Sequence, residues 1–246
     1  MSDLWLPVLL SFLAGGLVKG AVGLGLPTVV LGTLGAYMPL AEAAALLVIP
    51  SLATNAWQLV AGPRLRHLLG RLATLVGGLM VGTMVSPVGM ATVDTKSATL
   101  GLGVMLTVYA MFGLCSVRFV VRPAHECWLS PAIGVIAGVV NACTGLFVMP
   151  IVPYLQSLDL EKDELVQALA LCFTIGALAL AFRLHHDGTT VLGHAAGSTV
   201  ALVAALAGMP LGNLLRARVN EQVFRTCFYV GLLALGGMLA AKAFLR

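Results

Sequence analysis

An internal repeat is the feature that most constrains this chain. The segment from Trp5 to Pro27 returns in degraded form from Trp128 to Pro150, with its tryptophan, its Ala-Gly pair and its proline at one constant spacing. Each copy is an apolar run that glycines and a proline interrupt near its middle. Paired interruptions of this kind are typical of membrane proteins in which broken helices meet at a binding site.

The composition places this duplicated chain in a lipid bilayer. It is 59% hydrophobic and 10% charged, with a mean hydropathy of +1.00, whereas soluble domains are about 25% charged. A membrane-spanning helix needs roughly 20 apolar residues, so the length allows about eight to ten transmembrane or half-spanning helices. No basic run carries interleaved aromatic residues, so a nucleic-acid partner is excluded.

We therefore predict an all-α integral membrane protein made of two homologous halves, residues 1–122 and 123–246. Each half opens with a pair of short apolar segments, 4–18 with 26–36 and 129–142 with 147–157. Since each segment is too short to span alone, each pair is either one long span with an unwound middle or a short helical hairpin. Six further segments are expected to be ordinary spans: 40–61, 68–88, 97–117, 164–183, 190–214 and 223–244.

Basic residues in the loops predict the orientation of the first half. Arg64, Arg66 and Arg71 cluster between two spans, and Arg118 and Arg122 lie near the junction of the halves. Cytoplasmic loops are rich in Lys and Arg, so both clusters are expected to face the cytoplasm.

The orientation of the second half stays open between two alternatives. Parallel halves would place one basic set inside, namely Arg183, Lys242 and Arg246. Inverted halves would place another set inside, namely Arg216, Arg218 and Arg225. The inverted alternative puts slightly more basic residues in the cytoplasm and is the one we favour.

Lys19 is the only strongly charged residue well inside an apolar run. If Trp5 marks one membrane interface, a helix places Lys19 about 21 Å deep, beyond the midplane of a ~30 Å core. Such a lysine usually faces a partner or a water-filled cavity, unless its long stem reaches the far interface. Ala142 occupies the matching position in the second copy, so only the first copy would contribute a charged residue to a site between the two copies.

The first interruption consists of Gly20, Gly23 and Gly25, followed by Pro27. Proline suits the first turn of a helix, so a short helix is expected to begin near Leu26 with free N–H groups facing the interruption. The N-termini of helices bind anions, which makes this interruption a candidate anion site.

The second interruption offers a similar set of donors. Asn141, Thr144 and Gly145 precede Pro150 there. The alternative is that the glycines only permit tight helix packing. A binding role predicts that a side chain at Gly32, outside the interruptions, is better tolerated than one at an interruption.

Other polar residues favour an anionic ligand. Asn55 lies in the next span, where it either lines a site or joins helices. No Asp or Glu lies deep in a predicted span. The acidic residues near the spans belong to loops or helix starts: Glu42, Asp94, Asp159, Glu161, Asp163 and Glu164. The only deep charge is therefore positive, and the coupling ion, H⁺ or Na⁺, stays open.

This pattern resembles the sulfite exporter TauE/SafE family in length, hydrophobicity, duplication and the glycine-rich stretches before Pro27 and Pro150. The resemblance implies a secondary transporter of the bacterial inner membrane, and not an enzyme. It implies export of sulfite, sulfonates or related organic anions by alternating access, without a cofactor. We expect the anion to be bound by Lys19, Gly20, Gly23, Gly25, Pro27, Asn55, Asn141, Thr144, Gly145 and Pro150.

Two alternatives belong to other functional classes. The first is a membrane subunit that assembles a larger complex and transports nothing itself. The second is a membrane thiol-redox carrier that uses Cys143, although the matching position in the first copy is Gly20.

Overall fold

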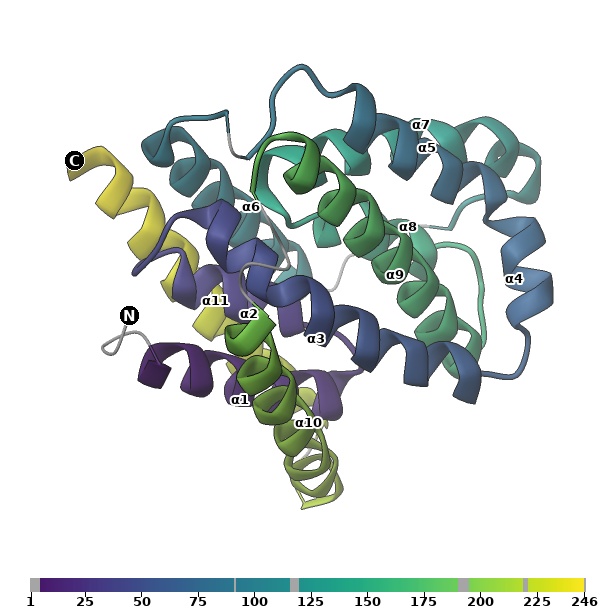
Figure 1. Ribbon diagram of the computed structural model, residues 1–246. Coiled ribbons are helices and arrows are strands. Elements are labelled where there is room, and N and C mark those ends of the chain that lie inside the picture. Colours follow the sequence, from purple (N-terminus) through teal and green to yellow (C-terminus); the bar gives the residue numbers. More distant parts are fainter. Residues whose placement is uncertain (1–4, 91, 116–119, 190–194, 219–220, 246) are drawn as a thin grey trace.

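The computed structural model describes residues 5–90, 92–115, 120–189, 195–218 and 221–245, and these form eleven helices and no strand. Seven helices are long and apolar enough to span a membrane, and one bent pair adds an eighth span if it is counted as one. The prediction of an all-α membrane protein is confirmed. Figure 1 shows a single bundle with both termini on the same side.

The helices follow the predicted segments closely. The first six are α1 (Trp5–Val22), α2 (Leu26–Leu34), α3 (Leu40–Ala61), α4 (Leu65–Arg71), α5 (Ala73–Val85) and α6 (Thr95–Cys115). The remaining five are α7 (Pro123–Thr144), α8 (Val148–Gln156), α9 (Lys162–His186), α10 (Ala195–Arg218) and α11 (Glu221–Leu245).

Each interruption is a helical hairpin. The Oγ1 atom of Thr33 in α2 donates a hydrogen bond to the Oγ atom of Ser11 in α1 at 2.8 Å, so α2 runs back along α1. The hydroxyl groups of Ser130 in α7 and Tyr154 in α8 are hydrogen-bonded at 2.5 Å, so α8 runs back along α7. The hairpin alternative is therefore right, and the long span with an unwound middle is wrong.

The predicted lengths of the opening segments need correction. α1 has 18 residues and α7 has 22, so each is long enough to span, and only α2 and α8 are short. The predicted first segment, 4–18, stopped just before Lys19. Lys19 instead continues the helix, since its charge is held inside the protein.

The segment 68–88 is also not an ordinary span. It is broken between α4 and α5, whose axes differ by 63°. Arg71, the last residue of α4, donates to both carboxylate oxygens of Glu126 in α7, at 3.0 and 2.7 Å. This bidentate pair holds the polar α4 at one end of the bundle, and α5 alone enters the apolar layer.

Glycines bring two pairs of parallel helices into close contact. A Cβ atom on Gly20 of α1 would lie 2.1 Å from the carbonyl oxygen of Met209 in α10. A Cβ atom on Gly138 of α7 would lie 2.4 Å from the carbonyl oxygen of Leu79 in α5. Membrane helices favour such contacts between small residues, so for Gly20 the packing role is the one that the structure supports.

Two other pairs are antiparallel. Gln167, near the start of α9, donates to the carbonyl oxygen of Leu59, near the end of α3, while the start of α3 and the residues after α9 line one cavity. In the second pair, Gly103 and Gly113 of α6 pack on Ala240 and Tyr229 of α11.

The main helix contacts keep their pattern under one exchange. Exchanging α1, α2, α3, α5 and α6 with α7, α8, α9, α10 and α11 turns the α1–α10 contact into α7–α5, and the α3–α10 contact into α9–α5. The same exchange maps the antiparallel pairs α3–α9 and α6–α11 onto themselves. An inverted repeat produces this pattern.

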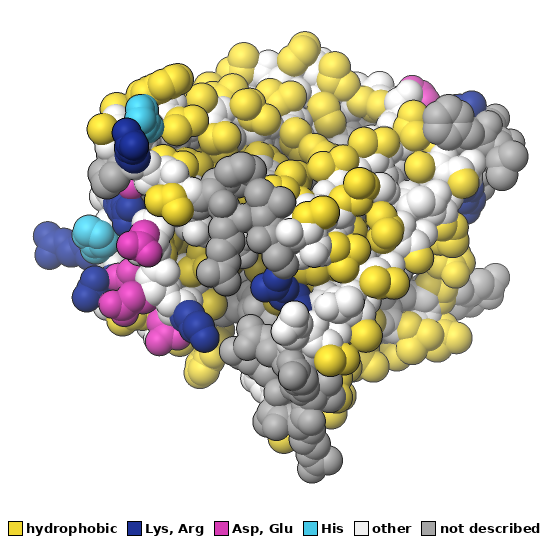
Figure 2. All heavy atoms as spheres, turned by 180° about the vertical axis from the view of Figure 1, so that it is seen from behind, with side chains coloured by type: hydrophobic (Ala, Val, Ile, Leu, Met, Phe, Trp, Pro, Cys, Tyr) yellow, Lys and Arg dark blue, Asp and Glu magenta, His cyan; other side chains and the backbone are white. Residues whose placement is uncertain are grey.

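Figure 2 shows most charged side chains of this face at one edge and a few at the opposite edge, with hydrophobic side chains over much of the surface between them and a basic side chain near the middle. The Arg64 end is defined by Arg64, Arg71, Glu126, Leu158, Glu164 and Gln167. The Glu42 end is defined by Pro39, Glu42, Met90, Thr95, Gly188 and Thr189. Trp57 and Trp128 are 73% and 63% exposed, as lipid-facing anchors would be.

The course of the helices assigns the basic residues to these ends. α10 is parallel to α1 and ends beside the C-terminal part of α3, so the Arg216 and Arg218 positions lie at the Arg64 end. α11 begins next to the end of α6, which places Arg225 there too. Arg216, Arg218 and Arg225 therefore lie at the same end of the bundle as Arg64, as the inverted alternative requires. Arg118 and Arg246 lie outside the described residues.

Candidate functional site

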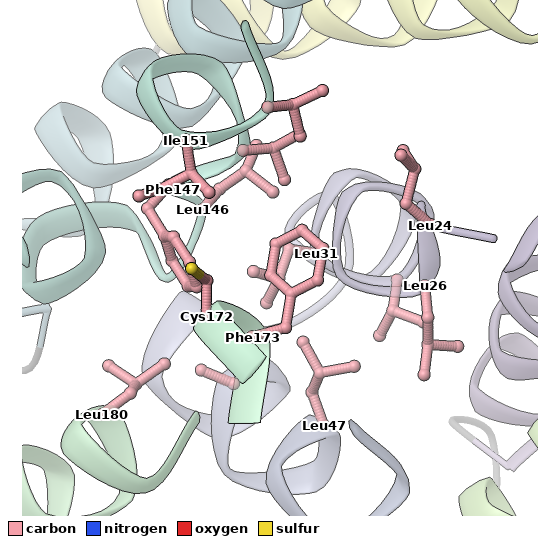
Figure 3. Close-up of a cluster of buried hydrophobic side chains, with 14 of the residues drawn as sticks. Leu24, Leu26, Leu31, Leu47, Leu146, Phe147, Ile151, Cys172, Phe173 and Leu180 are labelled. Atoms are coloured by element: carbon pink, nitrogen blue, oxygen red, sulfur yellow. The ribbon is translucent and has the colours of Figure 1, made fainter. Parts of the chain in front are cut away.

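A small central cavity lies between the two hairpins and the α3–α9 pair. Its volume is about 30 Å³, room for roughly one water molecule. Its walls include Pro27 of α2, Ser51 of α3, Asn141 of α7, Gly145 and Phe147 of the second hairpin turn, and Phe173 of α9. Figure 3 shows Phe147 and Phe173 facing each other across this region, with ring centroids 5.4 Å apart.

Lys19 is buried in protein and is bonded to α3, although it is not itself among the described residues that line this cavity. Its side chain is 3% exposed, and its Nζ atom donates to the Oγ1 atom of Thr54 at 2.9 Å and to the Oδ1 atom of Asn55. Lys19 therefore does not extend to the far interface. A lysine ammonium carries three N–H donors, so these two bonds leave one donor for a ligand.

No carboxylate balances the charge of Lys19 in the described part of the chain. The ion pairs found there involve Arg64, Arg71, Arg183 and His186. Lys19 is also the only Lys or Arg among the described residues that is buried. A buried charge costs several kcal/mol unless it is paired, so this site favours an anion.

The α3 helix connects Lys19 to the cavity wall. Ser51 lines the cavity and lies one helical turn before Asn55, a rise of about 5–6 Å. Thr54 accepts the bond from Lys19 while its own hydroxyl bonds to the carbonyl oxygen of Pro50 at 2.8 Å. The Thr54 hydroxyl therefore bonds both to its own helix and to Lys19.

The two hairpin turns share one backbone motif. The N–H group of Gly23 bonds to the carbonyl oxygen of Lys19 at 2.8 Å, and that of Gly145 bonds to the carbonyl oxygen of Asn141 at 2.8 Å. Both glycines have positive φ, 85° and 68°, as the left-handed C-terminal cap of a helix requires.

This motif corrects the sequence pairing of the two copies. The counterpart of Lys19 is Asn141, one residue before the Ala142 that the spacing of tryptophans and prolines selected. The pairing was wrong because the glycine that ends the helix fixes the backbone equivalence, and the second copy is one residue shorter between its tryptophan and this glycine.

Asn141 is fully buried and has one atom without a partner. Its Nδ2 atom donates to the carbonyl oxygen of Gly176 at 3.0 Å and to the Oγ1 atom of Thr83 at 3.3 Å. Its Oδ1 atom has no hydrogen-bond partner within the described residues. Since Asn141 lines the central cavity, this oxygen is available to a ligand there.

The other predicted residues have mainly backbone roles. Gly25 has a φ of 114° and precedes α2, and the carbonyl oxygen of Gly23 accepts a hydrogen bond from Gln58 at 3.0 Å. The Oγ1 atom of Thr144 bonds to the backbone of Val140 and Leu146, which closes the second turn locally.

Pro27 and Pro150 differ in their relation to the cavity. Pro27 lies in the first turn of α2 and lines the central cavity. Pro150 is half-buried in the first turns of α8 and is not among the described residues that line the cavity.

The sequence reasoning missed several residues of the site. Ser51, Thr83, Phe147 and Phe173 are single small or apolar residues in apolar helices, and they carry no pattern that marks them. They lie on α3, on α5, at the N-cap of α8 and on α9, and only the packing of these elements brings them together. Cys143 is half-buried, its Sγ atom lies 3.6 Å from the carbonyl oxygen of Val88, and all five cysteines are free.

A second, larger cavity opens at the Glu42 end. Its volume is about 380 Å³, and Glu42, Met90 and Thr189 are among its lining residues. Met90 is 4% exposed and lies close to Gly145, which lines the central cavity, because a Cβ atom on Gly145 would be 2.9 Å from the Cε atom of Met90. Met90 therefore lies between the larger cavity and a wall residue of the central cavity.

The fold and the site define a class of membrane transporter: paired helical hairpins beside a buried charge in a bundle with the contacts of an inverted repeat. The chain belongs to the sulfite exporter TauE/SafE family, whose model matches residues 8–239 of the 246. Comparison with curated proteins gives no significant match. Comparison with solved structures gives none either.

Proposed function

We propose that this chain is a secondary transporter that exports small anions such as sulfite, sulfonates or related organic anions across the bacterial inner membrane. The observation that carries the proposal is Lys19, a buried cation for which the described residues provide no carboxylate and which is bonded to α3 about one helical turn from Ser51 of the cavity wall. An anion that binds there compensates this charge.

Two helix N-termini support the same ligand. Pro27 in the first turn of α2 and Phe147 at the N-cap of α8 both line the central cavity. The N-terminal end of a helix is the positive end of its dipole and presents free N–H groups. The two hairpins would cradle an anion from opposite sides, with Lys19 adding a full charge on one side.

The proposed mechanism is alternating access between inverted halves, residues 1–122 and 123–246. At the Arg64 end, Arg64 pairs with Glu164 at 2.8 Å, and Gln167 bonds to both Leu59 and the Arg64 backbone. These contacts join the end of α3 to the start of α9 and close the path on this side.

At the Glu42 end, by contrast, the proposed transport path is open through the larger cavity. Glu42 is the third residue of α3, as Glu164 is the third residue of α9. Glu42 is exposed beside the larger cavity, and no ion pair of the described residues includes it. If the arginine-rich end is cytoplasmic, this conformation faces outward. Export then requires that the Arg64 end opens while the Glu42 end closes.

Transport by the purified chain alone tests this proposal. We expect saturable uptake of at least one of radiolabelled sulfite, a sulfonate or a small carboxylate into proteoliposomes. Imposed H⁺ and Na⁺ gradients in the same vesicles identify the coupling ion. Folded protein that moves none of these anions would contradict the proposal and would favour a subunit that transports nothing by itself.

A further inference from the structure

We infer that the central cavity binds a singly charged anion that carries its own hydrogen-bond donor, such as the protonated form of an oxyanion. In this arrangement Lys19 interacts with the negative charge and Asn141 accepts the donor. The inference rests on the proposed function and specifies the chemistry of the ligand at the same site.

The two residues hold equivalent positions with opposite hydrogen-bonding character. The carbonyl oxygen of each caps its hairpin turn at Gly23 or Gly145, and the side chain of each reaches the central helix beside it, α3 for Lys19 and α9 for Asn141. Lys19 offers only donors, while the free atom of Asn141 is an acceptor. A ligand between them therefore meets a cation on one side and an acceptor on the other.

The orientation of the Asn141 amide is fixed by its neighbours. The carbonyl oxygen of Gly176 can only accept, so the NH₂ group of Asn141 must face it. The Oδ1 atom then remains unpaired in a fully buried side chain. An unsatisfied buried acceptor is unfavourable, and an O–H or N–H group on the ligand would satisfy it.

The charge of the site matches one negative charge. Lys19 is the only buried Lys or Arg among the residues that the structure describes. A dianion would bring a second negative charge into apolar walls formed by Pro27, Phe147 and Phe173, without a second cation to balance it.

A metal cation fits the free oxygen of Asn141 less well. Hard cations need a shell of several oxygen ligands. The side-chain oxygens of the cavity walls come from Ser51 and Asn141, and the remaining side chains there are apolar. The volume of about 30 Å³ suits one water molecule on the Oδ1 atom in the resting state, which the ligand replaces when the hairpins part.

Competition in proteoliposomes tests the inference without any variant. Ethanesulfonate and 2-hydroxyethanesulfonate are monoanions at all working pH values and differ by one hydroxyl donor. We expect the hydroxylated anion to inhibit sulfite uptake at a concentration at least tenfold lower, which corresponds to about 1.4 kcal/mol. We also expect sulfite uptake to follow the hydrogensulfite fraction as the pH is changed.

The Asn141→Ala variant shows whether Asn141 accepts the donor. In this variant, both sulfonates should inhibit sulfite uptake at the same concentration, and the affinity for ethanesulfonate should be unchanged. The control variant Asn213→Ala, at an exposed asparagine, should keep the tenfold preference for 2-hydroxyethanesulfonate. Equal inhibition in the unaltered protein, or uptake that follows the dianion fraction, would overturn the inference and leave the proposed function intact. A complete lack of uptake would instead count against the proposed function.

Discussion

Lys19 and Asn141 occupy the same position in the two helical hairpins, since the carbonyl oxygen of each accepts a 2.8 Å hydrogen bond from a positive-φ glycine four residues later. The backbone is repeated, but the side chains differ in charge and in hydrogen-bonding character. A duplicated scaffold of this kind lets one half bind the charge of a ligand and the other half select its remaining groups.

The glycines of the hairpin turns should be required for a stable fold. Gly25 and Gly145 have φ values of 114° and 68°, and left-handed backbone costs an L-residue about 1–2 kcal/mol. We expect Gly25→Ala and Gly145→Ala to lower the melting temperature. Gly77→Ala, with open space around it in α5, should not do so.

Gly32 cannot serve as the tolerant control that the sequence suggested. A Cβ atom there would lie 2.4 Å from the Cδ2 atom of Leu235 in α11. A leucine at Gly32 should therefore destabilise the protein.

The prediction for the two turns is contradicted if Gly77→Ala lowers the melting temperature as much as Gly25→Ala and Gly145→Ala do, because the turns would then have no specific requirement for glycine.

The orientation of the bundle can be measured by labelling. Single cysteines at Arg66 and Thr189 lie at opposite ends. In intact cells, we expect a membrane-impermeant thiol reagent to label the Thr189→Cys variant and to leave the Arg66→Cys variant unlabelled until the membrane is permeabilised. The reverse labelling pattern would mean that the Arg64 end is periplasmic.

Breaking the Arg64–Glu164 pair should open the Arg64 end. Arg64 is 59% exposed and Glu164 is 8% exposed, so the pair is worth about 1 kcal/mol at most. We expect Arg64→Gln to increase the labelling of a Ser51→Cys reporter in the central cavity from the Arg64 side. Arg66→Gln, two residues away and exposed, is the matched control. Equal labelling rates in both variants would show that the pair does not act as a gate.

Met90 should control access from the other side. Its side chain lies between the larger cavity and Gly145. We expect Met90→Ala to speed the labelling of Ser51→Cys from the Glu42 end without changing the rate from the Arg64 end. An unchanged rate from the Glu42 end would mean that another group closes the central cavity.

The local features of the hairpins could be predicted from the sequence. The glycines before Pro27 and the residues before Pro150 correctly indicated short helices that begin near Leu26 and Val148. The depth of Lys19 in the apolar run correctly indicated a buried charge. These features follow from backbone geometry and hydropathy, which act within one segment.

The relationships between segments could not be predicted. Apolarity excludes water but does not distinguish a face toward lipid from a face toward protein, because both are apolar. Hydropathy therefore gave no sign that Ser51 and Phe173 share a cavity, or that Arg64 meets Glu164. The equivalence of Lys19 with Asn141 became visible only from the backbone of the two turns.

The central claim is that the charge of Lys19 binds the transported anion. Lys19→Met keeps the length of the side chain and removes the charge, and Lys242→Met, which removes a lysine bonded to the Ala36 carbonyl oxygen at 2.6 Å, is the matched control. The direct measurement is the initial rate of sulfite uptake into proteoliposomes for both variants, with equal melting temperatures as the test of folding. The account predicts at least a tenfold loss for Lys19→Met, about 1.4 kcal/mol, and a near-normal rate for Lys242→Met. A folded Lys19→Met protein that transports sulfite at the original rate would contradict it.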